Sequence, residues 1–382
     1  MQSLLVILLM LQLLGSGWSS SSLEQHTETH IQHRTSSHCS GNLYVGGATN
    51  YGFREIRTFL LSYNVSQAAR ESTIILIFGS KQRTDTTLSS FLSLFKNIAF
   101  EPIYLGPVNN THIGNFRFKW LLDFLQTKRG SGYCNVASLD TRDVYFQGDF
   151  FREVKFFKKE HEVTDSMDYI LLAKEGGGAE AMSGKPMNTC VWHQEAAGRP
   201  CITPLIDDYT TFMQNSMICS GTIAGTPQGL VVLFSVMDDA MKGLSNACMK
   251  MSMTDQIVLN MVVYEAAVTK RKWISELNRQ AYKRLKVLIP GNYANPMFTL
   301  GHVPTDEFTV AVHPAGSHMV IELLPSVNKY RTGGVPGIVH QYDRYEALGR
   351  SLRTQLQAAK GQQYGDTAKE KKNYVGPPRL FG

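Results

Sequence analysis

The chain has 382 residues, which is long enough to bury a full hydrophobic core and to form one large domain or two. Its hydrophobic fraction of 43% and charged fraction of 18% are those of an ordinary globular protein rather than of a disordered chain. The net charge of +6 is mild; it suits an anionic ligand such as a nucleotide, but is also common on solvated faces. We expect no nucleic-acid partner.

The first segment, residues 1–20, has the pattern of a targeting sequence. It is apolar from Leu4 to Leu14, and small and polar residues follow through Ser22. About eleven apolar residues are short for a spanning helix, which needs roughly twenty. A cleaved signal peptide is therefore favoured, although the length from Gln2 to Trp18 keeps a signal-anchor open. Both readings place the protein in the secretory pathway, in the lumen of the ER or Golgi, or outside the cell if the peptide is cleaved without retention. Membrane contact is expected only if the segment stays uncleaved.

Two polar segments flank the body of the chain. Residues 21–40 read as a stem, and residues 351–382 as a polar, basic tail with little to bury. The histidines of the stem favour a disordered segment over a metal site, because no apolar residue nearby fixes their geometry; they are His26, His30, His33 and His38. One large domain is therefore predicted for residues 41–350.

The body alternates strands and helices. Strands are predicted at 43–50, 72–80, 98–106 and 132–140, with helices at 53–63, 87–97 and 115–128 between them. In the helix at 115–128, the aromatic stripe Phe116, Trp120 and Phe124 marks an apolar face. This alternation predicts an α/β fold with a largely parallel sheet.

The second half continues the pattern. A strand is expected at 169–177, a strand, turn and helix at 215–243, a helix at 254–268, and late strands at 286–291 and 336–342. Thr226 and Pro227 fit the start of the helix that Gly243 ends, and Thr254 is expected to cap the next one. The glycines at 176–178 lack the spacing of a phosphate-binding motif and are read as a flexible loop.

Six cysteines fit an oxidising compartment: Cys39, Cys134, Cys190, Cys201, Cys219 and Cys248. They allow fifteen pairings, of which Cys190 with Cys201 is the simplest because both flank one short loop. No CxxC occurs, so a zinc ribbon or thioredoxin-like motif has no support. Sequons at Asn64 and Asn109 are compatible with N-glycosylation.

The most informative stretch is "DTRDVYFQGDFF", which begins at the end of a predicted strand with Asp140, Arg142 and Asp143. In open α/β sheets, ligands bind beyond the carboxyl ends of the strands, so these residues stand where a site is expected. Acids there also cap turns, and that alternative stays open. Asp149 is a further candidate cap for the segment after it.

With "NSMICSG", "TDQIVLN" and "GIVHQY", this stretch resembles, in order, four motifs of nucleotide-sugar-dependent glycosyltransferases of the GT-A fold, especially families 8 and 77. The resemblance spans roughly residues 43–345. It implies a Rossmann-type, mostly parallel sheet flanked by helices in a single large domain. It also implies a nucleotide-sugar donor, a UDP-sugar first of all, and a divalent cation, Mn²⁺ or Mg²⁺, that stabilises the leaving diphosphate.

The resemblance also implies roles for particular residues. Asp143 and His340 would bind the metal, and Asp140 and Arg142 the donor or its phosphates. Asn215 and Ser216 would bind the nucleotide-sugar, and Asp255 and Gln256 would face the transferred sugar. A purely structural role stays open for these residues. Asn215 and Ser216 could form a turn, Asp255 could start a helix, and His340 could be a core histidine.

One departure is notable. The family has Asp-x-Asp, whereas this chain has Asp-Thr-Arg-Asp, so alignment on Asp143 puts Thr141 where the first acid belongs. Either Asp140 reaches the ligand from its shifted position, or Arg142 pairs with it or with phosphate and reduces the need for metal. We therefore predict a retaining, metal-assisted glycosyltransferase of the secretory pathway acting on a glycan, protein or lipid acceptor. The alternative is a GT-A-like nucleotide- or glycan-binding protein without catalysis.

Overall fold

A computed structural model describes residues 39–49, 51–66, 72–95, 100–105, 113–176, 183–264, 274–291, 294–300, 303, 308–312, 319–323, 336–342 and 349–350. Contacts divide the chain into Met1–His38 and Cys39–Gly382, and every described residue belongs to the second unit. The targeting segment, most of the stem and the tail therefore lie outside the described residues, as do the second sequon and most of the glycine-rich loop. Among the described helices, none combines the length and apolar character that crossing a bilayer requires.

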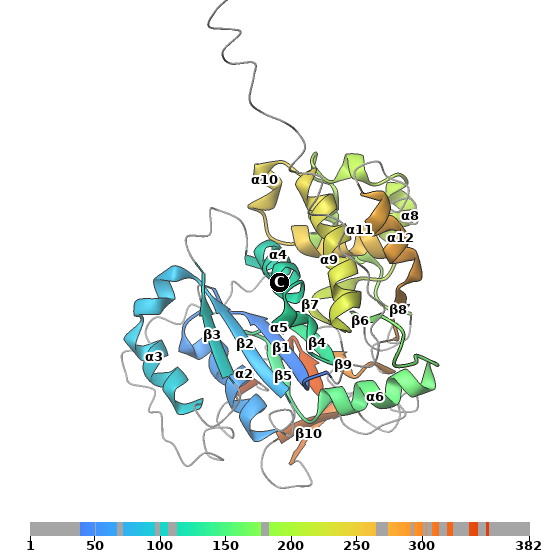
Figure 1. Ribbon diagram of the computed structural model, residues 1–382. Helices are drawn as coiled ribbons and strands as arrows, with labels where there is room; N and C mark the ends of the chain where they lie inside the picture. The colour runs from blue at the N-terminus through green and yellow to red at the C-terminus, as the bar shows by residue number, and fades with distance from the viewer. Residues whose placement is uncertain are drawn as a thin grey trace, which may run out of the picture. The chain divides into compact units, whose positions relative to one another are not determined.

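The central feature is a seven-stranded sheet with the strand order β3-β2-β1-β4-β7-β6-β8 (Figure 1). Every neighbouring pair is parallel except the two that involve β7, which runs antiparallel to both β4 and β6. The strands are β1 (Asn42–Gly47), β2 (Ser72–Phe78), β3 (Phe100–Tyr104), β4 (Asn135–Asp140), β6 (Tyr169–Lys174), β7 (Ile218–Gly225) and β8 (Lys286–Leu288). The predicted α/β class with a mostly parallel sheet is confirmed.

Two smaller sheets accompany it. One has the order β5-β12-β9, from Val144–Phe146, Ile338–His340 and Met297–Thr299; the other pairs β10 (Phe308–Val312) with β11 (Met319–Leu323). In the three-stranded sheet, β12 runs antiparallel to β5 and parallel to β9. This sheet brings a late segment of the chain beside the end of β4.

Helices cover both faces of the central sheet. They are α2 (Phe53–Val65), α3 (Thr86–Leu92), α4 (Ile113–Leu125), α5 (Lys128–Ser131), α6 (Phe150–Glu160), α7 (Val191–Ala197), α8 (Tyr209–Gln214), α9 (Pro227–Lys242), α10 (Asn246–Met249), α11 (Thr254–Tyr264) and α12 (Glu276–Arg284). Short 3-10 turns lie at Ser80–Thr84, Ser93–Phe95, Met187–Thr189 and Thr203–Leu205.

The core has two layers because side chains alternate across the sheet. In β1, Tyr44 joins one buried cluster with α2 and α3, whereas Leu43 and Val45 join the other with α4, α9 and α11. Both strand faces are apolar, as expected for strands covered on both sides. Each fully buried large apolar side chain contributes about 1.5–3 kcal/mol to stability.

Several local predictions can be compared with the structure. Thr226 caps α9, Pro227 is its first residue and Gly243 follows its end, as predicted. On α4, the predicted aromatics Phe116, Trp120 and Phe124 are half-buried, and Trp120 and Phe124 pack against the edge of the core. The core face of this helix is formed instead by Phe118, Leu121, Leu122 and Leu125.

Of the fifteen pairings that the sequence left open, the simplest one, Cys190 with Cys201, does not form. The bonds are Cys39–Cys134 and Cys201–Cys248, and Cys190 and Cys219 are free. Two disulfides are typical of proteins in oxidising compartments.

Candidate metal centre

Asp140 and Asp143 stand on either side of a sharp bend at the carboxyl end of β4. Asp140 is the last residue of β4, and Asp143 directly precedes β5. Between them, Thr141 is fully buried, and its hydroxyl donates to the carbonyl of Gly47 at 2.7 Å. Thr141 therefore points into the body of the protein, and the two acids that flank the bend face the same space.

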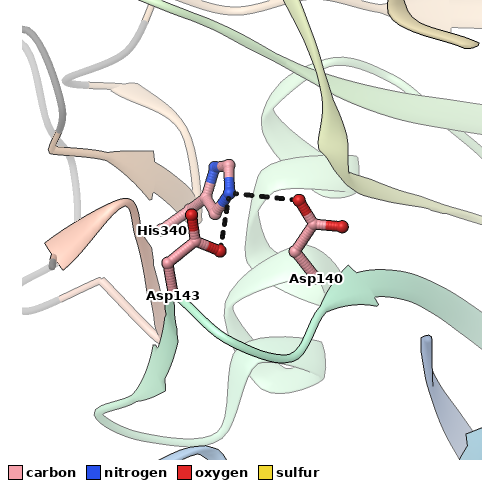
Figure 2. A group of neighbouring side chains, drawn as sticks. All are labelled: Asp140, Asp143 and His340. Atoms are coloured by element: carbon pink, nitrogen blue, oxygen red, sulfur yellow. Dashed lines mark ion pairs between the residues drawn. The ribbon is translucent and has the colours of Figure 1, made fainter. Parts of the chain in front are cut away.

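His340 reaches these acids through the three-stranded sheet. It is the last residue of β12 and pairs with Val144 of β5. The next residue, Gln341, has a left-handed backbone (φ 60°), and its N–H donates to the Asp143 carbonyl at 2.8 Å. These backbone contacts fix His340 beside Asp143; Figure 2 shows the resulting position of the imidazole.

The three side chains converge on one point. His340 Nε2 lies 3.3 Å from Asp143 Oδ1 and 3.7 Å from Asp140 Oδ2, and one ligand atom from each residue falls within 4.8 Å of the others (Figure 2). Asp143 and His340 are buried, and beyond these ion pairs neither Asp143 Oδ1 nor His340 Nε2 has a hydrogen-bond partner among the described residues. Such atoms are costly to bury unless something binds them, and a divalent cation with oxygen and nitrogen ligands does so. The residues therefore fit a divalent metal ion.

Gly221 of β7 provides the space for this cluster. A Cβ on Gly221 would lie 2.7 Å from both Asp140 Oδ2 and His340 Nε2, and 2.6 Å from His340 Cε1. Any side chain here would push into the point where the three ligand atoms meet. The position therefore requires glycine as long as the cluster is intact.

Arg117 of α4 holds the first acid in place. Its guanidinium donates to Asp140 Oδ1 and, at 2.9 Å, to the Ser220 carbonyl, with 3% of its side chain exposed. Burial alone would raise the pKa of Asp140, but Arg117 and then His340 hold that pKa well below its usual value. One carboxylate oxygen of Asp140 thus faces Arg117, and the other faces the cluster.

The other two groups are charged for similar reasons. Burial opposes ionisation of Asp143, yet His340 and Arg142 hold its pKa below the usual value. Burial likewise would lower the pKa of His340, but Cys219 and the two carboxylates raise it well above the usual value. The raised pKa favours the protonated form of His340, whose positive charge offsets those of the two carboxylates.

Asp255 and Gln256 lie in the first turn of α11, both buried. Asp255 packs against Gly114 of α4, where an added Cβ would lie 2.9 Å from its Oδ2, and it acts electrostatically on Arg117. The predicted cap Thr254 is instead the first helical residue. Its hydroxyl donates to the Cys248 carbonyl at 2.9 Å.

Gln256 is the centre of a buried polar network. Its Nε2 donates to Glu175 Oε1 at 3.2 Å and contacts His193 Nε2 at 3.1 Å, and its Oε1 accepts from Ser220 Oγ at 3.4 Å. Ser220 also joins this network to Arg117. The structure thus links the predicted sugar-facing helix to the acid cluster through a few contacts.

The other predicted residues lie apart from the cluster or at its rim. Arg142 is 43% exposed, with its guanidinium 3.5 Å from Asp143 Oδ2. Asn215 ends α8 and bonds the Thr211 and Phe212 carbonyls. Ser216 donates to the Ser183 carbonyl. The "NSMICSG" motif reaches the cluster through its last residues instead, while Asp149 caps α6 by accepting from Arg152 N–H.

Sequence reasoning did not find Arg117, Cys219 or Gly221 as site residues. Arg117 was detectable in principle, because it stands four residues before the buried Leu121 and so shares the core face of α4. A basic residue on that face needs an acid partner. Cys219 and Gly221 carried no such local signal, because their role depends on a register between β4 and β7 that the sequence does not display.

Neither a protein-family model nor a curated protein matches the chain. Among solved structures, the chain is similar to the crystal structure of S. aureus TarS, with a TM-score of 0.34 and 14% identity over 65% of this chain and 35% of that one. The chain thus spans about a third of the length of TarS.

Proposed function

We propose that the protein is a metal-assisted glycosyltransferase that uses a nucleotide-sugar donor, UDP-linked in the first instance. The observation that carries this proposal is the cluster of Asp140, Asp143 and His340 at the carboxyl edge of a mostly parallel sheet. This edge is where open α/β sheets bind ligands. The motif order that resembles families 8 and 77 adds the donor class and a retaining outcome to the proposal.

In this proposal, different residues serve different parts of the sugar transfer. Asp140, Asp143 and His340 would hold a divalent cation, which when bound stabilises the negative charge on the departing diphosphate. Arg142, exposed at the rim, offers a second positive charge to the phosphates. Asp255 and Gln256, in the first turn of α11 near Arg117 and Ser220, would face the donor sugar.

The proposal also includes an acceptor class and a cellular compartment. A glycan, protein or lipid hydroxyl takes the sugar, and the two disulfides suit a secretory or extracellular setting.

One observation favours a second candidate, a GT-A-like protein that binds nucleotide or glycan without turnover. Each acid already has a guanidinium near it, Arg117 for Asp140 and Arg142 for Asp143. These two arginines supply positive charge beside the acids without a metal ion, as the Asp-Thr-Arg-Asp spacing suggested.

The deciding experiment is a thermal-shift titration of the protein with UDP, with and without Mn²⁺. A ligand that binds only the folded state raises the melting temperature according to its affinity. We expect a UDP shift that needs Mn²⁺ and is lost in Asp143→Asn. Transfer or hydrolysis of a UDP-sugar with Mn²⁺ then separates the enzyme from the binding protein.

Two glycine variants sharpen the test. Gly221→Ala keeps every ligand but fills the space between them, so it should abolish the Mn²⁺-dependent shift. Gly148→Ala is the matched control, because nothing lies within 4 Å of its added Cβ. No shift with any nucleotide, from folded protein, would refute the transferase and leave the acids as turn residues.

A further inference from the structure

A free thiol touches the far side of the candidate metal ligand His340. Cys219 of β7 is 1% exposed, is outside both disulfides and lies with its Sγ 3.2 Å from His340 Nδ1. It stands two residues before Gly221, so both face the same side of β7. The sulfur therefore reaches one ring nitrogen while the space over Gly221 receives the other.

We propose that Cys219 is a positioning residue of this centre: its sulfur accepts the Nδ1–H of His340 and so directs Nε2 toward the two carboxylates. This inference rests on the proposed function, because it assigns the metal site an outer partner. The sulfur is not itself one of the converging ligand atoms, which come from Asp140, Asp143 and His340.

The surroundings of the sulfur support an acceptor role. The backbone N–H of Gly221 already donates to Cys219 Sγ at 3.3 Å, so the sulfur faces donors on this side. A hydrogen on Nδ1 completes the same pattern. It also agrees with both states of the ring, because a protonated imidazole and a neutral one bound through Nε2 each carry hydrogen on Nδ1.

The consequence lies at the other nitrogen. With Nδ1–H held by sulfur, the neutral ring presents its Nε2 lone pair to Asp143 Oδ1 at 3.3 Å and Asp140 Oδ2 at 3.7 Å. In this neutral form, three electron-rich atoms face one another, an arrangement that a divalent cation satisfies. Without an acceptor at Nδ1, the ring can place its hydrogen on Nε2 instead and bond Asp143, which competes with metal. Partners of this kind typically change metal affinity by about 10–100-fold.

The test compares Mn²⁺ affinities, measured from the paramagnetic resonance signal of free Mn²⁺. We expect Cys219→Ala to bind Mn²⁺ about 10–100-fold more weakly, and Cys219→Ser to retain more affinity than Cys219→Ala because a hydroxyl also accepts a hydrogen bond. Cys190→Ala is the matched control: Cys190 is the other free cysteine, half-buried before α7, and its loss should leave the affinity unchanged.

Four outcomes are possible, and each decides for or against the inference. Mn²⁺ affinity that decreases from the unmodified chain to Cys219→Ser and then to Cys219→Ala supports the inference. A Cys219→Ala variant that binds Mn²⁺ as tightly as the unmodified chain overturns it while leaving the metal centre standing. So do Ser and Ala variants that lose affinity equally and melt at lower temperature, since that result indicates packing alone. If the unmodified chain binds no Mn²⁺, the metal centre itself falls, and this inference with it.

Discussion

At the scale of single residues, the charge of His340 determines how a metal ion competes with protons. Its pKa lies well above the usual value because Cys219, Asp143 and Asp140 outweigh the effect of burial. A cation must therefore displace the proton on Nε2. We expect Mn²⁺ affinity to rise by about tenfold per pH unit between about pH 6 and pH 8, in the direction of higher pH, because one proton is released per ion bound.

The measurement is a Mn²⁺ titration at several pH values, in a buffer that does not bind the metal. His340→Ala should remove most of the affinity and most of its dependence on pH. An unmodified protein whose affinity is equal at both ends of the range would show that His340 is not a ligand.

The same scale shows which site residues the sequence can predict. Asp140, Asp143 and His340 stood out because acids at a strand end and a late histidine fit a known motif order, and the structure brings all three together. The sequence left open how the Asp-Thr-Arg-Asp stretch presents its first acid, and the structure answers this question. Thr141 is turned into the core by its bond to Gly47, and Asp140 takes the place beside His340. That choice depends on a strand pairing which no local pattern encodes.

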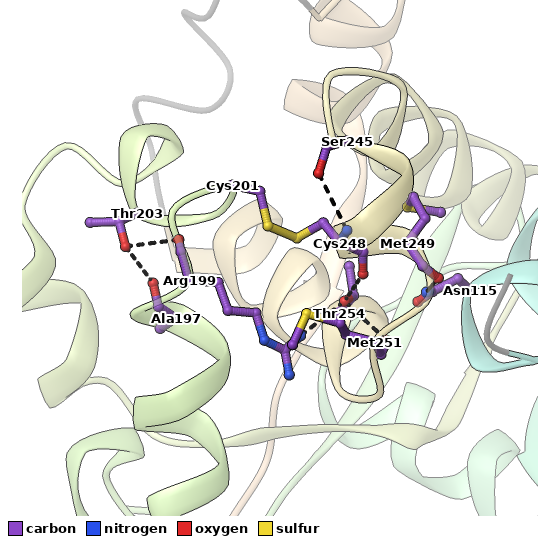
Figure 3. The surroundings of a disulfide bond; sticks show 10 residues. All are labelled: Asn115, Ala197, Arg199, Cys201, Thr203, Ser245, Cys248, Met249, Met251 and Thr254. Atoms are coloured by element: carbon purple, nitrogen blue, oxygen red, sulfur yellow. Dashed lines mark hydrogen bonds between the residues drawn. A yellow bond between two sulfur atoms is a disulfide. The ribbon is translucent and has the colours of Figure 1, made fainter.

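At the scale of elements, the Cys201–Cys248 disulfide holds the start of α11. Cys248 lies in α10, its carbonyl accepts from Thr254 Oγ1, and Arg199 donates to the same hydroxyl at 3.1 Å (Figure 3). On the other side, Asn115 of α4 donates to the Met249 carbonyl at 2.8 Å. These contacts fix the turn that carries Asp255 and Gln256.

Replacing both cysteines with serine should lower the free energy of unfolding and loosen that turn. The two cysteines have a sequence separation of 47, for which the chain-entropy model gives a loss of about 4 kcal/mol. Urea unfolding measures the loss, and UDP-sugar turnover should fall together with it. Turnover that stays at the level of the unmodified protein would show that the first turn of α11 holds its place without the bond.

Element prediction worked best where the pattern was long. The strands from β1 to β4, and helices such as α2 and α9, lie close to their predicted ranges because apolar periodicity continues over many residues. The simplest cysteine pairing, Cys190 with Cys201, does not form, because two cysteines close in sequence need not be close in space. The helix α6 was not predicted as a helix, although Asp149 was named as a candidate cap and its side chain does cap it.

At the scale of the whole molecule, β4 connects two distant regions of the domain. Its last residue, Asp140, belongs to the candidate centre, whereas Cys134 directly precedes its first residue and bonds Cys39. Six residues of strand span roughly 20 Å, at about 3.3 Å per residue. The Cys39–Cys134 bond therefore fastens the start of the described chain far from the candidate metal ligands, and the two ends of β4 should respond independently to mutation.

A variant with both Cys39 and Cys134 replaced by serine tests this separation. The bond closes a loop with a sequence separation of 95 residues, so the chain-entropy model gives a loss of about 4–5 kcal/mol in the free energy of unfolding. Mn²⁺ affinity should stay that of the unmodified chain, because the strand pairings of β4 with β1 and β7 hold Asp140 in register without the bond. Urea unfolding and a Mn²⁺ titration of the same sample measure the two quantities. Loss of Mn²⁺ binding while the variant is still folded would mean that the centre depends on the whole sheet rather than on the local bend, Arg117 and β12.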